Sequence, residues 1–259
     1  MANHVPAPST RGFDTRPQRH TALTIALFAV VVLSATAVAV AFKETALWII
    51  ERYGGSSDAT QSADRLPPVV AACTAAGTTV ISAALGLSAA RRWPGMSGLD
   101  AIAATARGDD QRISMRATLM RSAGVWLTLV GLVPIGRESA ILETGGAIGS
   151  TLGRRFRGQG AAMAAAGIAA AFAAAYHAPI AAVAYLEEHF RIRGSRRALT
   201  FTIGGAAGGF FISKYLFGSG AIFPELHASW HELLLAGAVA VVPATVASRA
   251  FLEVRTRVT

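Results

Sequence analysis

The hydrophobic residues of the chain fall into long runs that short polar segments separate. The main runs cover residues 22–42, 67–90, 117–133, 161–176, 199–217 and 230–251. A helix that crosses a bilayer needs about 20 mostly apolar residues. The pattern therefore predicts an all-α polytopic membrane protein. We expect the first helix to continue past Phe42 through Ile50, and Gly54–Ser57 to form a flexible break after it.

Two further helical segments are too short to cross a bilayer. One is expected to follow the turn at residues 93–98 and to end near Ala106, and the other runs from Ile180 to Glu187, Glu188 and His189. Such helices can be embedded only where the protein interior satisfies their free backbone groups. The expected fold therefore contains short, tilted and broken helices.

Basic residues cluster between the hydrophobic runs and predict the orientation. The clusters are the tail 1–20 with Arg11, Arg16 and Arg19, Arg91/Arg92, Arg154–Arg157, Arg191–Arg197 and Arg255/Arg257. Arginine and lysine are enriched on the cytoplasmic side of membrane proteins and bind anionic lipid headgroups. We expect a multi-pass protein of the cell membrane with a cytoplasmic N-terminus, and loops 107–116 and 218–229 on the outside.

Three parts are expected along the chain. Residues 1–20 are predicted to be a disordered basic cytoplasmic tail, because they are polar and contain three prolines. Residues 21–217 are predicted to form the main transmembrane unit. Residues 218–259 are predicted to be an outer loop, a last transmembrane helix and a basic cytoplasmic end.

Composition narrows the function classes. The chain is 53% hydrophobic and only 15% charged, so its net charge of +9 reflects membrane topology rather than nucleic-acid binding. The single cysteine, Cys73, allows no internal disulfide and is expected to be a small buried apolar side chain. The membrane runs contain no nucleophile–base pair and no metal-ligand spacing, so neither an enzyme, a cofactor nor a metal site is predicted.

The segment Gly136–Gly149 places an arginine and two glutamates between apolar helices. Pro134 and Gly136 interrupt the preceding helix, and a new helix is predicted to start near Arg137. A helix that starts inside the membrane points unpaired N–H groups and the positive end of its dipole at the interior, which makes an anion site. Ionisable residues in such a place are functional candidates by default.

Several motifs of the chain resemble the CLC family of chloride channels and chloride/proton antiporters. Gly136-Arg137-Glu138 followed by Gly145-Gly146-x-Ile148-Gly149 resembles the family's GREGP helix. The run Ala166–Phe172 and then His177-Ala178-Pro179-Ile180-Ala181 resembles the following segment with its NAP(L/I)AG stretch. Ser97-Gly98-Leu99 stands where the family has SGIP. The three matches occur in order over roughly residues 90 to 190.

The resemblance implies a fold and a set of site residues. CLC subunits each build an anion pathway from two inverted repeats and work as oligomers, here a homodimer. Ser97, with Gly98 and Leu99, would bind a central anion through the serine hydroxyl. Glu138 would be the gate at the outer anion site and the outer proton carrier, with the amides of Ser139 and Ala140 facing the anion. Gly136 and Arg137 support the motif.

An inner proton-transfer glutamate is also implied. Counting without gaps from His177, its place falls on His189, and a slip of one residue puts it on Glu188. We keep Glu188 as the candidate. A salt-bridge cluster of Glu187 and Glu188 with the neighbouring arginines is the alternative.

The chain departs from the family pattern in three ways. The Gly-Pro after the glutamate is Ser139-Ala140, and the proline of SGIP is Asp100. Proline in the first turn pre-organises a helix start, so its loss softens that start. The chain also resembles only the first repeat and one further helix, without a second helix-break motif of the GxFxP kind or a late pore tyrosine.

Each of these residues has a simpler interpretation. Glu138 could only favour the helix dipole, and Ser97 with Asp100 could form an N-cap close to a capping box. Arg137 is expected to pair with a carboxylate or a loop carbonyl, and Glu143 to have a structural role. Gly145 and Gly149 are expected to allow close helix packing inside the subunit.

The sequence thus predicts membrane transport of chloride or another small anion, as a channel or an anion/proton antiporter with a glutamate gate. The alternative is a non-transporting remnant or assembly partner that lacks the second half of the pore.

Overall fold

The computed structural model describes residues 21–93, 100–101, 104–105, 113–155, 159–190 and 196–218. The chain separates into two units, Met1–Ile222 and Phe223–Thr259. The predicted last helix at 230–251 belongs to the second unit. Both this segment and the tail 1–20 lie outside the described residues. The description below concerns the first unit.

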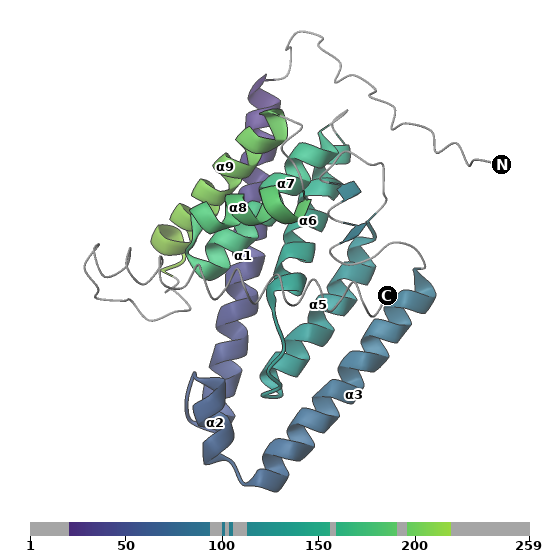
Figure 1. The fold of residues 1–259 in the computed structure, drawn as a ribbon, viewed down its shortest axis with the longest axis vertical. Helices are drawn as coiled ribbons and strands as arrows, with labels where there is room; N and C mark the ends of the chain where they lie inside the picture. The colour runs from purple at the N-terminus through teal and green to yellow at the C-terminus, as the bar shows by residue number, and fades with distance from the viewer. Residues whose placement is uncertain are drawn as a thin grey trace, which may run out of the picture. The chain divides into compact units, whose positions relative to one another are not determined.

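All regular structure in the described part of the chain is helical, as predicted (Figure 1). The helices are α1 (Thr21–Gly54), α2 (Ala59–Arg65), α3 (Pro68–Arg92), α5 (Met115–Val130), α6 (Glu138–Arg154), α7 (Gly160–Tyr176), α8 (Pro179–Phe190), α9 (Arg196–Phe211) and the π-helix η2 (Ile212–Leu216). Residues 100–101 and 104–105 are also helical.

The sequence located most of these helices to within a few residues, but it missed α2. The break expected at Gly54–Ser57 is present as bends at residues 55–58, but no helix was expected between it and Pro67. Asp58 accepts hydrogen bonds from the backbone amides of Thr60 (2.8 Å) and Gln61 (3.3 Å), and so starts the short helix α2. An aspartate at this position satisfies two amides that a helix start otherwise leaves unpaired.

The alanine-rich helix α7 is the centre of the core. It packs against α1, α6, α8 and α9, and nearly all of its alanines are buried (Figure 1). Leu142 on α6 and Leu186 on α8 are fully buried in the same cluster. The core is therefore built from a thin helix that many neighbours approach closely.

Glycines make this close approach possible. A Cβ atom added at Gly145 or Gly149 of α6 would overlap a backbone oxygen of α7, that of Gly167 or Met163. Gly205 and Gly209 of α9 approach the Ala166 and Ala170 backbone of α7 in the same way. Small residues at helix interfaces are the usual way to increase packing contact inside a membrane. The expected packing of Gly145 and Gly149 within the subunit is confirmed.

Two of the described helical segments, Ala22–Arg65 and Pro68–Arg92, are long and apolar enough to cross a membrane. α3 runs beside α5 (Figure 1). Most of the large apolar side chains of α3 are exposed. Cys73 of α3 is exposed, so the expectation that it is buried was wrong. An apolar run that faces lipid has the same composition as one that faces a core, and the sequence did not separate the two.

Candidate functional site

The connection between α5 and α6 is an irregular segment that starts α6 as a new helix. Leu132 adopts a left-handed conformation with φ of 62°, and Val133 donates a backbone hydrogen bond to Thr128 (3.1 Å). Pro134 follows directly and cannot donate a backbone hydrogen bond. The predicted break at Pro134 and Gly136 is thus present, and α6 begins at Glu138.

The first turn of α6 offers unpaired backbone donors. The first hydrogen bond of the helix runs from the amide of Ile141 to the carbonyl of Arg137 (3.2 Å). The amides of Glu138, Ser139 and Ala140 therefore have no acceptor within the helix. The N-cap residue is Arg137, whose side chain has only donors and makes no capping hydrogen bond. These amides lie at the positive end of the helix dipole, where a negative charge is stabilised.

The Glu138 carboxylate is the negative group next to this helix end. Its Oε1 accepts a hydrogen bond of 2.8 Å from the hydroxyl of Tyr176, the last residue of α7. Its Oε2 lies over Gly136, where an added Cβ would overlap it. The side chain thus folds back along the connection that precedes α6. Glu138 and Ser139 are exposed, whereas Ala140 is buried.

Arg137 takes part through the same tyrosine. Its guanidinium and the Glu138 carboxylate both interact with the Tyr176 hydroxyl. We expected Arg137 to pair with a carboxylate or a loop carbonyl. That pairing stays a prediction, and the guanidinium lies close to the Tyr176 hydroxyl that holds the neighbouring glutamate.

A backbone break places Tyr176 at this position. His177 ends α7 in a left-handed conformation (φ 53°, ψ 32°), and Pro179 starts α8 two residues later. The His177 ring lies edge-on against Phe210, and its Nε2 is 3.4 Å from the Ser213 hydroxyl on η2. The predicted interruption near His177 and Pro179 is therefore confirmed, and these contacts fix where α7 ends.

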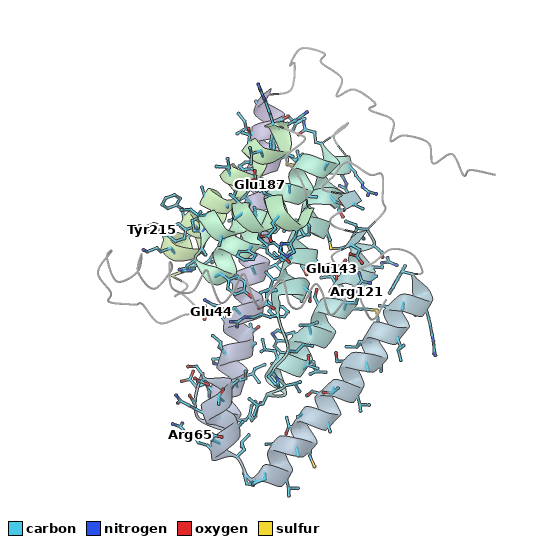
Figure 2. The ribbon with its side chains drawn as sticks, viewed as in Figure 1. Glu44, Arg65, Arg121, Glu143, Glu187 and Tyr215 are labelled. Carbon is cyan, nitrogen blue, oxygen red and sulfur yellow. The ribbon has the colours of Figure 1, made fainter. Side chains whose placement is uncertain are left out.

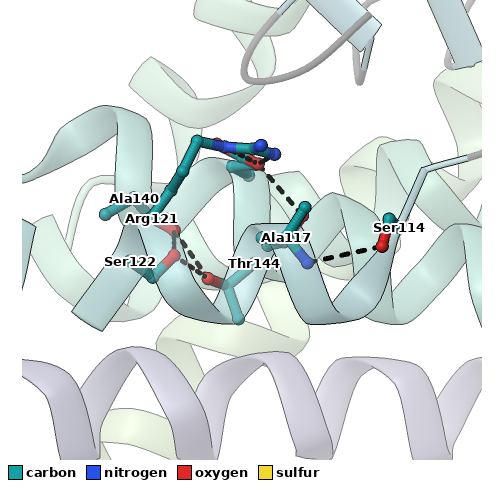
Figure 3. Close-up of polar contacts among 8 residues, drawn as sticks. Ser114, Ala117, Arg121, Ser122, Ala140 and Thr144 are labelled. Carbon is teal, nitrogen blue, oxygen red and sulfur yellow. Dashed lines mark hydrogen bonds and ion pairs between the residues drawn. The ribbon is translucent and has the colours of Figure 1, made fainter. Parts of the chain in front are cut away.

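A buried polar cluster joins α5 to α6 behind the helix start (Figure 3). The Oε1 atom of Glu143 accepts hydrogen bonds from the Thr118 hydroxyl (3.0 Å) and from Nε of Arg121 (3.0 Å). The Arg121 guanidinium also forms an ion pair with it (Figure 2). The two side chains are 21% and 6% exposed, respectively. The expected structural role of Glu143 thus has a definite form.

The adjacent hydroxyls continue this cluster toward the site. The hydroxyl oxygens of Ser122 and Thr144 are 2.8 Å apart (Figure 3). Each hydroxyl also lies within hydrogen-bond distance of the Ala140 carbonyl oxygen, at 3.3 Å for Ser122 and 2.7 Å for Thr144. Ala140 is in the first turn of α6. The cluster therefore fixes the position of the helix end that carries the unpaired amides.

The remaining predicted site residues lie elsewhere or outside the described residues. Ser97, Gly98 and Leu99 are outside them, so their distance from Glu138 is not described. Asp100 is helical and exposed. Glu188 is an exposed residue near the end of α8, and the neighbouring His189 ring stacks on Tyr185 at 4.2 Å.

Sequence reasoning missed Arg121 and Tyr176. Arg121 is the one charged residue in the run 117–133, and a charged residue inside a membrane run needs a partner. That signal could have predicted a buried pair. Tyr176 directly precedes the helix break, but its contact with Glu138 joins residues that are far apart in the sequence, and no local pattern indicates it.

No group of three or more His, Cys, Asp or Glu side chains that could hold a metal ion occurs among the described residues.

Comparisons with known proteins identify the family and the fold of the chain. The model of the voltage gated chloride channel family matches residues 79–258. The search of curated proteins found no match. Among solved structures, the chain is similar to the X-ray crystal structure of a slow cyanobacterial Cl⁻/H⁺ antiporter, with a TM-score of 0.60 and 23% sequence identity. The match covers 79% of this chain and 49% of that chain, so this chain spans about half the length of the antiporter.

Proposed function

Because the chain belongs to the voltage gated chloride channel family, a family of membrane proteins and not of enzymes, we propose that it moves chloride or a similar small anion across the cell membrane. The anion binds at the N-terminus of α6, where the amides of Ser139 and Ala140 have no helical acceptor. The N-terminal tail is cytoplasmic, and the working unit is a homo-oligomer, a dimer in the simplest case, in contact with anionic lipids.

Glu138 acts as the gate of this pathway. Its carboxylate lies beside the same helix end that attracts the anion, so the two compete for one positive region. Ionised, the carboxylate blocks the site. Protonated, it loses its negative charge and leaves the amides to the anion. One observation carries the proposal: the acidic side chain of Glu138 lies at the start of α6, a helix that begins after the irregular segment following α5.

Ser97, Gly98 and Leu99 supply the central anion site in this proposal, with the Ser97 hydroxyl as donor. They belong to the stretch that the family model matches, although they lie outside the described residues. Gly136 and Arg137 support the conformation of the chain at the start of α6.

Proton coupling distinguishes an antiporter from a channel. Glu188 is our candidate for inner proton transfer, since it is the acidic residue nearest to the expected position. The variant Glu188→Gln of an antiporter is expected to keep chloride flux and to lose proton movement. If the protein is a channel, the same variant leaves chloride flux unchanged, and neither wild type nor the variant moves protons.

A second candidate function is that of a non-transporting assembly partner. The observation that favours it is length, because the chain spans 49% of the antiporter chain that it resembles. A pathway enclosed by two repeats needs a second half beyond the part that this chain matches.

The deciding experiment is chloride efflux from liposomes that contain this chain alone, with the external pH recorded at the same time. Wild type is compared with Glu138→Ala. The control is Glu51→Ala, because Glu51 is an exposed acidic residue near the C-terminal end of α1. Flux that Glu138→Ala abolishes or uncouples from protons, and that Glu51→Ala leaves intact, supports transport. A folded protein with no flux above empty liposomes supports the assembly partner.

A further inference from the structure

The hydroxyl of Tyr176 is the one described side-chain donor to the Glu138 carboxylate. It donates a hydrogen bond of 2.8 Å to Oε1 and also interacts with the guanidinium of Arg137. Thirty-eight residues separate Tyr176 from Glu138, so the contact exists only because α6 and α7 pack together. A hydrogen bond to a charged acceptor is stronger than one between neutral groups.

The Tyr176 ring is held in place independently of this bond. Its centroid is 4.9 Å from the ring of Phe172, one turn back on α7, and Phe172 in turn lies 5.3 Å from the ring of Tyr185 on α8. The left-handed residue His177 ends α7 directly after the tyrosine. Aromatic contacts of this kind stabilise a ring orientation. The hydroxyl is therefore presented to Glu138 by a fixed support.

We propose that Tyr176 is a positioning residue that holds the ionised Glu138 carboxylate at the start of α6. The inference deepens the gate function proposed above and rests on it. Among the described residues, the groups that lie near Glu138 include Arg137, the N-cap residue of α6, Tyr176 on α7 and Tyr185 on α8. Only the Tyr176 hydroxyl among them donates a described hydrogen bond to the carboxylate.

The bond links the position of the side chain to its protonation. The phenol donates strongly to a carboxylate and weakly to a neutral carboxylic acid. Protonation of Glu138 thus weakens the contact that keeps the side chain folded over Gly136. The side chain is then free to leave, and an anion can take its place at the amides.

The test is the variant Tyr176→Phe, which removes the hydroxyl and keeps the ring. Without the donor, the contact that holds the ionised carboxylate over Gly136 is lost. We expect the midpoint of the flux-against-pH curve to move up by about one pH unit. The infrared band of the Glu138 carboxylate, assigned with Glu138→Gln, should titrate with the same upward shift in lipid nanodiscs.

Tyr185→Phe is the matched control. It also removes a phenolic hydroxyl near Glu138, and the Tyr185 ring contacts Phe172, which supports the Tyr176 ring as well. No described hydrogen bond joins Tyr185 to Glu138, so both midpoints should stay within about 0.3 pH units of wild type. Equal shifts in the two variants would assign the effect to general packing and overturn the proposal.

The infrared titration also separates this proposal from the transport function. If wild type carries no flux, the transport function fails, while the band still shows whether Tyr176 controls the ionisation of Glu138. An unchanged band in Tyr176→Phe overturns the positioning role whatever the flux. Should Tyr176→Phe not fold, replacement of the 4 tyrosines of the chain by 3-fluorotyrosine strengthens the donor, and the midpoint must then move down.

Discussion

At the scale of single residues, Gly136 decides where the Glu138 carboxylate can lie. The Oε2 atom occupies the space that a Cβ at residue 136 would need. A carboxylate is the far end of a flexible side chain, so it can move aside without a change in the helices. The glycine of the Gly-Arg-Glu motif thus has a steric role here that is separate from backbone flexibility.

We predict that Gly136→Ala displaces the Glu138 carboxylate without unfolding the protein. The vacated helix end should then bind chloride more tightly, by roughly three- to tenfold, since the competing negative charge is further away. Isothermal titration calorimetry with chloride on the purified protein measures this.

Gly77→Ala on α3 is the control, because an added Cβ there meets nothing within 4 Å. It should leave chloride affinity unchanged. A Gly136→Ala protein that binds chloride no better than wild type, at an unchanged melting temperature, would contradict the steric argument.

At the scale of elements, the buried pair of Arg121 and Glu143 ties α5 to α6. The two side chains are largely buried, and Thr118 adds a third hydrogen bond. Removal of one partner leaves an uncompensated charge in an apolar surrounding, and that costs more than loss of the whole pair. The same interface fixes Ala140 in the first turn of α6 through Ser122 and Thr144.

We predict that Arg121→Met lowers the free energy of unfolding by about 3 kcal/mol, and that the double variant Arg121→Met/Glu143→Leu recovers more than half of the loss. Chemical denaturation in a mild detergent, with Glu143→Leu to complete the cycle, measures the coupling. Additive losses in the double variant would mean that the two side chains do not act as a pair.

The contact between α6 and α7 depends on small residues. Gly149 faces the Met163 carbonyl so closely that a methyl group would overlap it, and backbone cannot move aside as a side chain can. We predict that Gly149→Ala costs about 2 kcal/mol and several degrees of melting temperature.

Gly86→Ala on α3 tests the same substitution where nothing lies within 4 Å of the added atom. This variant should be neutral or slightly stabilising, because alanine is a better helix former than glycine. Equal melting temperatures for the two variants would show that α6 and α7 are not in close contact.

At the scale of the whole molecule, the basic residues at the ends of α1 and α3 predict a membrane orientation that cysteine labelling can check. α1 follows the basic tail, and α3 ends at Arg91 and Arg92, so both of these ends should be cytoplasmic. The segment between Gly54 and Pro68 joins the opposite ends of the two helices and should face the outside.

We predict that, in a Cys73→Ala background, Ser57→Cys reacts with a membrane-impermeant maleimide on intact cells. Arg92→Cys should react only after the cells are permeabilised. Both positions are exposed, so access to the reagent depends on the side of the membrane alone. The reversed labelling pattern would overturn the proposed orientation.

The sequence by itself determined the helical membrane class, most helix positions, and the broken helix that starts at Glu138. These features follow from local causes: the length of apolar runs, the missing N–H and fixed φ of proline, and the charge of single residues. The Gly-Arg-Glu motif and the run around His177 also pointed to the family that the comparisons establish.

Only the tertiary structure decided which side chains meet. The bonds from Tyr176 to Glu138 and from Arg121 to Glu143 join residues 38 and 22 positions apart. Whether Cys73 faces a core or the outside, and whether Gly149 contacts backbone, depends likewise on which helices pack together. Hydrophobic pattern sets the length of a helix, but it does not set its neighbours, because lipid and protein interiors are equally apolar.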